Sequence, residues 1–322
     1  MTADVGGGRL GNRLKDRAIP IDVIHVPIAL GANRAGPEQG PAVLDEELRR
    51  ILDFRGFPEI LDRLSPPVTI DAPGLDETEN AGPEVENAFH AAAIADVCVR
   101  LSSAVSESIA DGRFPLVLGG DHSLSIGSLA GASTAGRIGA IWIDAHGDIN
   151  TPQTSPSGNV RGMPLAASLG YGPEPLVNVG HRVDLAIDDL VYIGVRDLDP
   201  GERELLRQSP AMLFTMESVD TMGIDAVTEE AIRRLLERGV YGVHLSFDFD
   251  ALDPSVFPAT GVTVPGGLTY REARRCLTGL RASNLPILSA DIVEFDPTLD
   301  GRPETARIAG RLVAALLGEE LA

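Results

Sequence analysis

Side chains that can bind metal ions occur in three segments of the sequence, each at the end of an apolar run. These side chains are Asp144, His146 and Asp148 in the first segment, Asp248 and Asp250 in the second, and His122 in the third. In the first two segments they occupy alternate positions, and alternate residues of an extended chain lie on one face. Each segment therefore presents its carboxylates and imidazoles on one side.

A cluster of carboxylates needs a compensating cation. Any one of these acids alone would more often be a turn residue or a helix cap, but coincidence at three sites is less plausible. Packed together without a cation, the four aspartates would raise one another's pKa and cost stability. Four carboxylates and two imidazoles suit two divalent ions bridged by shared carboxylates. Ligand hardness favours Mn²⁺ over Zn²⁺ or Cu²⁺, so we expect two Mn²⁺, with other divalent metals still possible.

Short, nearly continuous apolar runs must position these side chains. The runs span residues 21–28, 115–118, 138–143, 190–195, 211–214, 243–249 and 286–293. Such runs are typical of strands buried on both faces of a parallel sheet. The alternation with helical patterns predicts a single doubly wound α/β domain, with a central, mostly parallel β-sheet flanked by helices on both faces. Functional groups should then gather at the carboxyl ends of the strands.

The helical patterns lie between these runs, for example over 86–110 and 228–238. For the second of these, Thr228 is the expected N-cap and Gly239 the expected C-terminal stop. Residues 151–175 are expected to form a surface loop over the strand ends, where binding groups tend to lie. Residues 1–18 are expected to form a flexible N-terminal tail, and residues 19–322 the α/β catalytic domain.

Composition excludes several classes of protein. The 322 residues carry a formal net charge of −20, which repels nucleic acid phosphates and anionic membrane surfaces. No apolar run has the length of a transmembrane helix. Only two cysteines occur, so the chain has no disulfide framework, and we expect a cytoplasmic protein. Since nucleic acid and membrane partners are disfavoured, we expect a small-molecule substrate.

The motifs resemble those of a known family. The segments 119–123 (GGDHS), 144–148 (DAHGD) and 246–254 (SFDFDALDP) are similar to three signatures of the ureohydrolases, the arginase and agmatinase superfamily, and come closest to bacterial-type arginases. The resemblance implies an arginase-like fold and Mn-dependent hydrolysis of L-arginine to L-ornithine and urea by a metal-bridging hydroxide. It also implies a homo-oligomer, either a trimer or a hexamer.

The resemblance implies roles for individual residues as well. One metal would be held by His122, Asp144, Asp148 and Asp248, and the other by Asp144, His146, Asp248 and Asp250. The substrate α-carboxylate would be bound by Asn150, Thr154, Ser157 and Asn159, and the α-ammonium by Asp199 and Glu202 with support from Asp197. Glu294 would bind the guanidinium group, and Asp148 would also act as a catalytic residue. Without the resemblance, the segments that carry these substrate-binding residues would be interpreted as ordinary turns.

Arg161 departs from the family pattern, because the family carries a proton-shuttling histidine at this position. A guanidinium cannot shuttle protons near neutral pH. Either Asp148 protonates the leaving group unaided in a slow or alkaline-shifted arginase, or the substrate is another guanidino acid. That substrate could be a guanidino-carboxylate or N-hydroxyarginine, with an anionic group that pairs with Arg161. Two alternatives remain: an exposed Arg161 without a role, and a weakly catalytic paralogue that binds arginine or metal.

Overall fold

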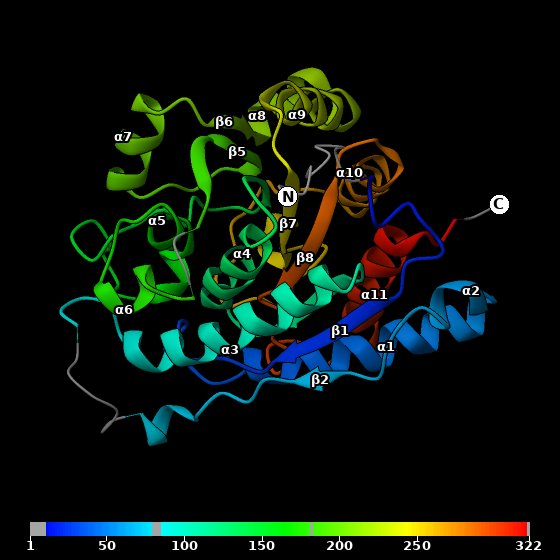
Figure 1. Cartoon of the computed structure of the whole chain (residues 1–322), viewed down its shortest axis with the longest axis horizontal. Coiled ribbons are helices and arrows are strands. Elements are labelled where there is room, and N and C mark those ends of the chain that lie inside the picture. The colour runs from blue at the N-terminus through cyan, green and yellow to red at the C-terminus, as the bar shows by residue number, and fades with distance from the viewer. Residues whose placement is uncertain (1–10, 79–84, 181–182, 321–322) are drawn as a thin grey trace, which may run out of the picture.

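The computed structural model describes residues 11–78, 85–180 and 183–320, in which helices cover both faces of a central sheet (Figure 1). Within these residues the sheet has eight strands in the order β2-β1-β3-β8-β7-β4-β5-β6, and all paired strands run parallel. The strands are β1 (Ile21–Val26), β2 (Val68–Thr69), β3 (Phe114–Gly119), β4 (Ile138–Ile143), β5 (Leu185–Val195), β6 (Met212–Thr215), β7 (Gly242–Asp248) and β8 (Ile287–Val293). The predicted single doubly wound α/β domain is confirmed.

The helices form two layers, each packed on one of two buried apolar clusters. They are α1 (Gly40–Arg55), α2 (Pro58–Leu61), α3 (Ala91–Ala110), α4 (Ser125–Ser133), α5 (Pro164–Ser168), α6 (Glu174–Val177), α7 (Pro200–Gln208), α8 (Met216–Met222), α9 (Ile224–Arg238), α10 (Tyr270–Ala282) and α11 (Pro303–Leu317). One cluster contains residues of α1 and α8 to α11, and the other contains residues of α3 to α7. In Figure 1, α3 lies beside α4 and α1 lies beside α11.

Burial on both faces explains why the central strands read as continuous apolar runs. In β4, Ile141 and Ile143 belong to one cluster, whereas Ala140 and Trp142 belong to the other. All residues of β3, β4, β7 and β8 are buried. A parallel sheet covered by helices on both sides requires apolar side chains at successive positions.

Some element boundaries differ from the predictions. Helix α9 begins at Ile224, and Thr228 lies inside it with its hydroxyl donating to the Ile224 carbonyl at 2.7 Å, so the predicted N-cap is wrong. Gly239 does end this helix, in the left-handed conformation with φ 67°. Helix α3 begins at Ala91 rather than near residue 86, because His90 adopts φ 57°. The expected loop 151–175 contains the short helix α5.

The predicted flexible tail contains packed residues. Its residues 1–10 lie outside the described residues, but Leu14 is fully buried. The Asn12 amide donates to the Leu280 carbonyl at 3.0 Å, and the Arg13 guanidinium donates to the Ile109 carbonyl at 3.1 Å. Residues 12–14 therefore pack against the α/β domain, unlike the tail expected there.

The strand order brings the predicted site segments together. Strands β3, β8, β7, β4 and β5 are consecutive in the sheet, and the candidate residues follow the carboxyl ends of these strands. Because the strands are parallel, those ends meet along one edge. Within the described part of the chain, no helix is long and apolar enough to cross a membrane.

Candidate active site

A cavity of about 310 Å³ opens at the carboxyl edge of the sheet. Its lining residues are His122, His146, Asp148, Asn150, Ser155, Ser157, Asn159, Arg161, Gly162, Asp197, Asp199, Glu202, Asp248, Asp250, Val262 and Glu294. Of the residues predicted for the site, only Asp144 and Thr154 do not line it. Asp144 is fully buried among the metal-competent side chains, and Thr154 donates to the Asn150 side chain at 2.8 Å.

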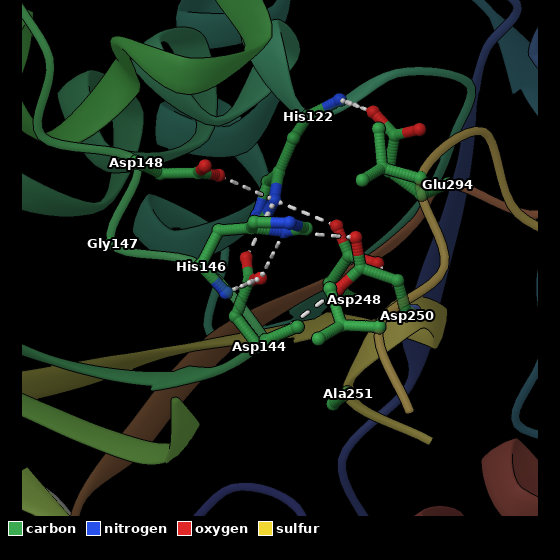
Figure 2. A network of polar contacts seen from close by, with 12 residues as sticks. His122, Asp144, His146, Gly147, Asp148, Asp248, Asp250, Ala251 and Glu294 are labelled. Atoms are coloured by element: carbon green, nitrogen blue, oxygen red, sulfur yellow. Dashed lines mark hydrogen bonds and ion pairs between the residues drawn. The ribbon is translucent and has the colours of Figure 1, made fainter. Parts of the chain in front are cut away.

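The two histidines are surrounded by carboxylate oxygens, as Figure 2 shows. His122 Nδ1 lies 3.2 Å from Asp144, 2.9 Å from Asp148 and 3.1 Å from Asp248. His146 Nδ1 lies 3.4 Å from Asp144 and 3.1 Å from Asp250. Two groups of potential ligands result, His122–Asp144–Asp248 and Asp144–His146–Asp250, which share Asp144.

The hydrogen bonding of His122 tests whether a metal ion fits this cluster. Its Nε2 lies 2.7 Å from the Ser246 hydroxyl, while its buried Nδ1 has no hydrogen-bond partner among the described residues. Three carboxylate oxygens converge on Nδ1, and a single ring proton cannot serve all three. A buried ring nitrogen without a hydrogen-bond partner beside three carboxylates is an arrangement that a bound cation stabilises. The donor set therefore fits divalent metal.

Without a metal, the electrostatics of the cluster are unfavourable. Burial and the neighbouring Asp144 raise the pKa of Asp148 to about 7. Burial opposes the charged form of His146, but Asp250 and Asp144 outweigh it and raise the pKa of this imidazole to about 12. Protons thus take the place of a cation, and metal binding must release them.

Trp142 positions two of the metal-competent side chains, a role that the sequence did not suggest. Its ring stacks on His122 with the centroids 4.3 Å apart and the planes 3° apart. Its indole N–H donates to Asp144 at 3.0 Å. Trp142 and Asp144 have the same parity at the end of β4, which is the signal that could have revealed this contact.

Asp148 and Glu294 have left-handed backbone conformations, with φ 50° and φ 64°. Non-glycine residues pay a conformational penalty there, and such residues tend to cluster at functional sites. In each case the strained residue follows a central strand and places a carboxylate in the cavity. The strain is thus associated with the direction of these two side chains.

The remaining predicted residues form the polar wall of the cavity. The Asn150 amide donates to Asp199 at 2.8 Å, which connects the segment after β4 with the start of α7. Glu202 accepts from the backbone N–H groups of Ile149 and Asp199 at 3.1 and 3.0 Å. Burial and Asp148 raise the pKa of Glu202 to about 7. Ser157, Asn159 and Asp197 also line the cavity.

Asn87 and Arg196 support the cavity walls, and neither was predicted. Asn87, at φ 57°, donates to the carbonyls of Pro152 and Ser155 at 2.6 and 2.8 Å. It thereby holds the segment that carries Ser157 and Asn159. The Arg196 guanidinium donates to the carbonyl of Asp250 at 2.8 Å and to other carbonyls nearby. A single sequence gives no sign of contacts between such distant segments.

Arg161 forms an ion pair inside the cavity. Its Nη1 donates to Glu294 Oε2 at 3.0 Å, and only 16% of its side chain is exposed. The alternative of a solvent-exposed Arg161 is therefore wrong. Burial opposes its charge, but the carboxylates of Glu294 and Asp121 outweigh this effect and raise the pKa of the guanidinium, so it stays cationic.

The fold and the metal-competent cavity are those of a hydrolase of the ureohydrolase class, and the comparisons with known proteins agree. The family model of the arginase family matches residues 19–318, and the chain belongs to that family. It is 43% identical to the arginase of Bacillus caldovelox over 307 residues, covering 94% of this chain and 99% of the relative. It is 40% identical to the arginase of Staphylococcus aureus strain COL over 311 residues, covering 94% and 98%.

Solved structures lead to the same family. Native Bacillus caldovelox arginase has a TM-score of 0.85 at 42% identity, covering 94% of this chain and all of the other. Entamoeba histolytica arginase, solved in complex with L-ornithine, has a TM-score of 0.81 at 29% identity, covering 93% and 99%. Formimidoylglutamase from Bacillus subtilis, at 19% identity with a TM-score of 0.75, covering 98% and 95%, shares the fold alone. The chain is thus an enzyme of the ureohydrolase class.

Proposed function

We propose that the protein hydrolyses the guanidino group of L-arginine to L-ornithine and urea. The observation that carries this proposal is one cavity that joins two groups of metal-competent residues to a wall of acidic and neutral polar side chains. Relatives named arginase, 40 to 43% identical across 94% of the chain, support the choice of substrate. An amino acid with a guanidino group matches a cavity with these distinct polar regions.

We assign the metal ligands as predicted, with two Mn²⁺ as the cofactors. One set is His122, Asp144, Asp148 and Asp248, and the other is Asp144, His146, Asp248 and Asp250. When bound, a pair of divalent cations lowers the pKa of a water molecule and so supplies a nucleophile at neutral pH. The unpartnered His122 Nδ1 and the shared Asp144 support this assignment.

The other residues bind and orient the substrate. Glu294 binds the guanidinium group, and Asp148 holds the proton that the leaving amine needs. Asp199 and Glu202 face the α-ammonium with support from Asp197. Ser157 and Asn159 donate to the α-carboxylate, and the hydrogen bonds of Asn150 with Asp199 and Thr154 hold the two regions together.

Three further properties belong to this proposal. We assign catalysis to the domain over residues 19–322. We propose a homo-oligomer, a trimer or a hexamer, on the basis of the family resemblance. A cytoplasmic location agrees with two cysteines, Cys98 and Cys276, that are both free and buried.

A second candidate is hydrolysis of another guanidino acid, such as a guanidino-carboxylate or N-hydroxyarginine. The Arg161–Glu294 ion pair favours it, because Arg161 places a cation in the cavity. A substrate with an additional anionic group would compensate that cation, whereas L-arginine has its only carboxylate on the α-carbon.

Urea release tests the proposal directly. The manganese-loaded protein is assayed with L-arginine, agmatine and several guanidino acids, and L-arginine should give the highest kcat/KM. Asp148→Asn should lower kcat by about 10² to 10⁴, because a proton-transfer group is lost. Asp96→Asn, which changes a 74% exposed carboxylate on α3, is the matched control and should keep full activity.

Either of two results would contradict the proposal. A higher kcat/KM for another guanidino acid would replace L-arginine with the second candidate. Full activity of Asp148→Asn on L-arginine would refute the role of this carboxylate in the reaction.

A further inference from the structure

A guanidinium group that belongs to the chain itself lies in the cavity. Arg161 Nη1 donates to Glu294 Oε2 at 3.0 Å, and the two side chains are only 16% and 4% exposed. The other oxygen, Glu294 Oε1, accepts from the backbone N–H of His122 at 3.0 Å. Both oxygens of this carboxylate are therefore engaged.

The surroundings anchor the backbone of Arg161 and leave room for its guanidinium group. The backbone N–H of Arg161 donates to the Gly31 carbonyl at 3.2 Å. A Cβ atom at Gly261 would lie 2.7 Å from Arg161 Nη1 and 3.6 Å from Glu294 Oε2. The absence of a side chain at Gly261 thus leaves the space in which the ion pair forms. The backbone at 161 is anchored, while the long side chain retains several rotatable bonds.

We propose that Arg161 competes with the guanidinium group of the substrate for Glu294 and thereby sets the affinity of the cavity for guanidinium ligands. This inference rests on the proposed function, in which Glu294 binds that group. The ion pair with Arg161 demonstrates that the carboxylate accepts a guanidinium in this geometry. A second guanidinium can take the same place only when Arg161 has left it, because two like charges in a buried site repel each other.

The competition lowers the affinity of every ligand that binds Glu294 by the same factor, but weakly binding ligands then lose their occupancy first. Only the fraction of molecules with Arg161 displaced binds a guanidinium, so the apparent affinity falls by that fraction. A bare guanidinium ion has no other contacts that could offset this loss. A substrate that also contacts Asp199, Glu202 and Asn159 gains binding energy far from the reacting carbon, and that energy drives the displacement. At a given concentration, small guanidinium compounds that bind weakly are therefore left largely unbound, whereas a substrate with these further contacts still binds.

Calorimetric titration of the manganese-loaded protein with guanidinium chloride tests the inference. If Arg161 is displaced in about a tenth of the molecules, Arg161→Met should bind guanidinium about tenfold more tightly than the wild type. The KM for L-arginine should fall more than kcat changes. Arg161→Lys, whose compact ammonium lacks the planar fork, should give an intermediate affinity. Arg100→Met is the matched control, since it removes an exposed cation paired with Asp96.

A second substitution tests whether the change in guanidinium affinity depends on the Glu294 carboxylate. In the background of Glu294→Gln, Arg161→Met should no longer increase the affinity for guanidinium. The gain in affinity of Arg161→Met over the wild type should be the same near pH 7 and near pH 9. An equal gain shows that a change in the ionisation of Glu294 does not cause it. If Arg161→Met is unstable in thermal melts, tighter binding by Arg161→Lys than by the wild type supports the same conclusion.

Guanidinium affinity that is unchanged or weaker in folded Arg161→Met or Arg161→Lys would overturn the inference. An equal gain in Arg100→Met would also overturn it, because net charge alone would then explain the effect. Failure of the proposed function is a different result: no variant would release urea from L-arginine, while the guanidinium titrations would still report on the competition.

Discussion

Trp142 is buried behind the cavity lining and has no chemistry of its own, yet it orients two groups that do. Trp142 stacks on His122 and donates to Asp144, so it restrains one imidazole and the carboxylate shared by both ligand groups. Partners of metal ligands typically alter metal affinity about 10- to 100-fold when they are removed. The indole is therefore expected to matter for metal binding rather than for substrate contact.

We predict that Trp142→Phe weakens Mn²⁺ binding about tenfold, because the phenyl ring can still stack but cannot donate to Asp144. Free Mn²⁺ measured by electron paramagnetic resonance during titration gives the affinity. Tyr241→Phe is the control, since it also removes a polar group from an aromatic side chain. Tyr241 directly precedes β7 and so lies at the edge of the sheet opposite the cavity. Equal Mn²⁺ affinity in Trp142→Phe and the wild type would contradict the prediction.

The residue types of the site were readable from the sequence, but their pairing was not. Asp144, His146 and Asp148 could be recognised from their alternate spacing after an apolar run. Arg161 could be recognised as a departure from the family pattern, yet its partner Glu294 lies 133 positions away. Charge and spacing along the chain carry no information about a contact of that range, and the fold alone brings the two groups to 3.0 Å.

At the level of secondary structure, the central strands could be predicted because burial on both faces gives continuous apolar runs. Strand β2 was missed, because it has only two residues and both are exposed. The start of α9 was misplaced at Thr228, since a threonine hydroxyl bonds equally well to a carbonyl inside a helix and to an N–H at its start. Local sequence does not separate these two uses.

The segment after β4 depends on a distant element for its position. Asn87 donates to two of its carbonyls, and the Phe89 backbone N–H donates to the Gly158 carbonyl at 3.0 Å. This bracing restrains the loop that carries Ser157 and Asn159. A loop restrained in its binding conformation loses less entropy when the substrate binds.

We predict that Asn87→Ala raises the KM for L-arginine about tenfold while kcat changes less, because two hydrogen bonds of about 1 kcal/mol each are lost. Steady-state urea release measures both constants. Asn178→Ala, at the end of α6 and away from the cavity lining, is the control. A KM equal to that of the wild type would show that Asn87 does not restrain the loop during binding.

At the scale of the whole molecule, the cavity concentrates negative charge in a chain that is already acidic. The formal net charge is −20, and Asp144, Asp248 and Asp250 are buried at the carboxyl edge of the sheet. Buried like charges destabilise the folded state unless a cation compensates them. Metal binding should therefore contribute to the stability of the entire domain.

We predict that removing the metal with a chelator lowers Tm by several degrees. A ligand at about 100 times its Kd adds about 2.7 kcal/mol to the free energy of unfolding, provided that the unfolded chain does not bind it. Thermal melts of the loaded and the chelated protein measure the shift, and readdition of Mn²⁺ should restore the higher Tm. A Tm that is unaffected by the chelator would indicate that the cluster contributes no metal-linked stability.

The position of β8 in the sheet has a consequence for how the protein is made. This strand lies between β3 and β7, so the sheet remains two separate pieces until residues 287–293 are available. A nascent chain on the ribosome that ends before β8 has two unpaired inner strand edges, and exposed edges promote aggregation. His122 follows β3 in one piece, whereas Asp144 and Asp248 lie at the ends of β4 and β7 in the other, so truncation before β8 should prevent these three side chains from coming together.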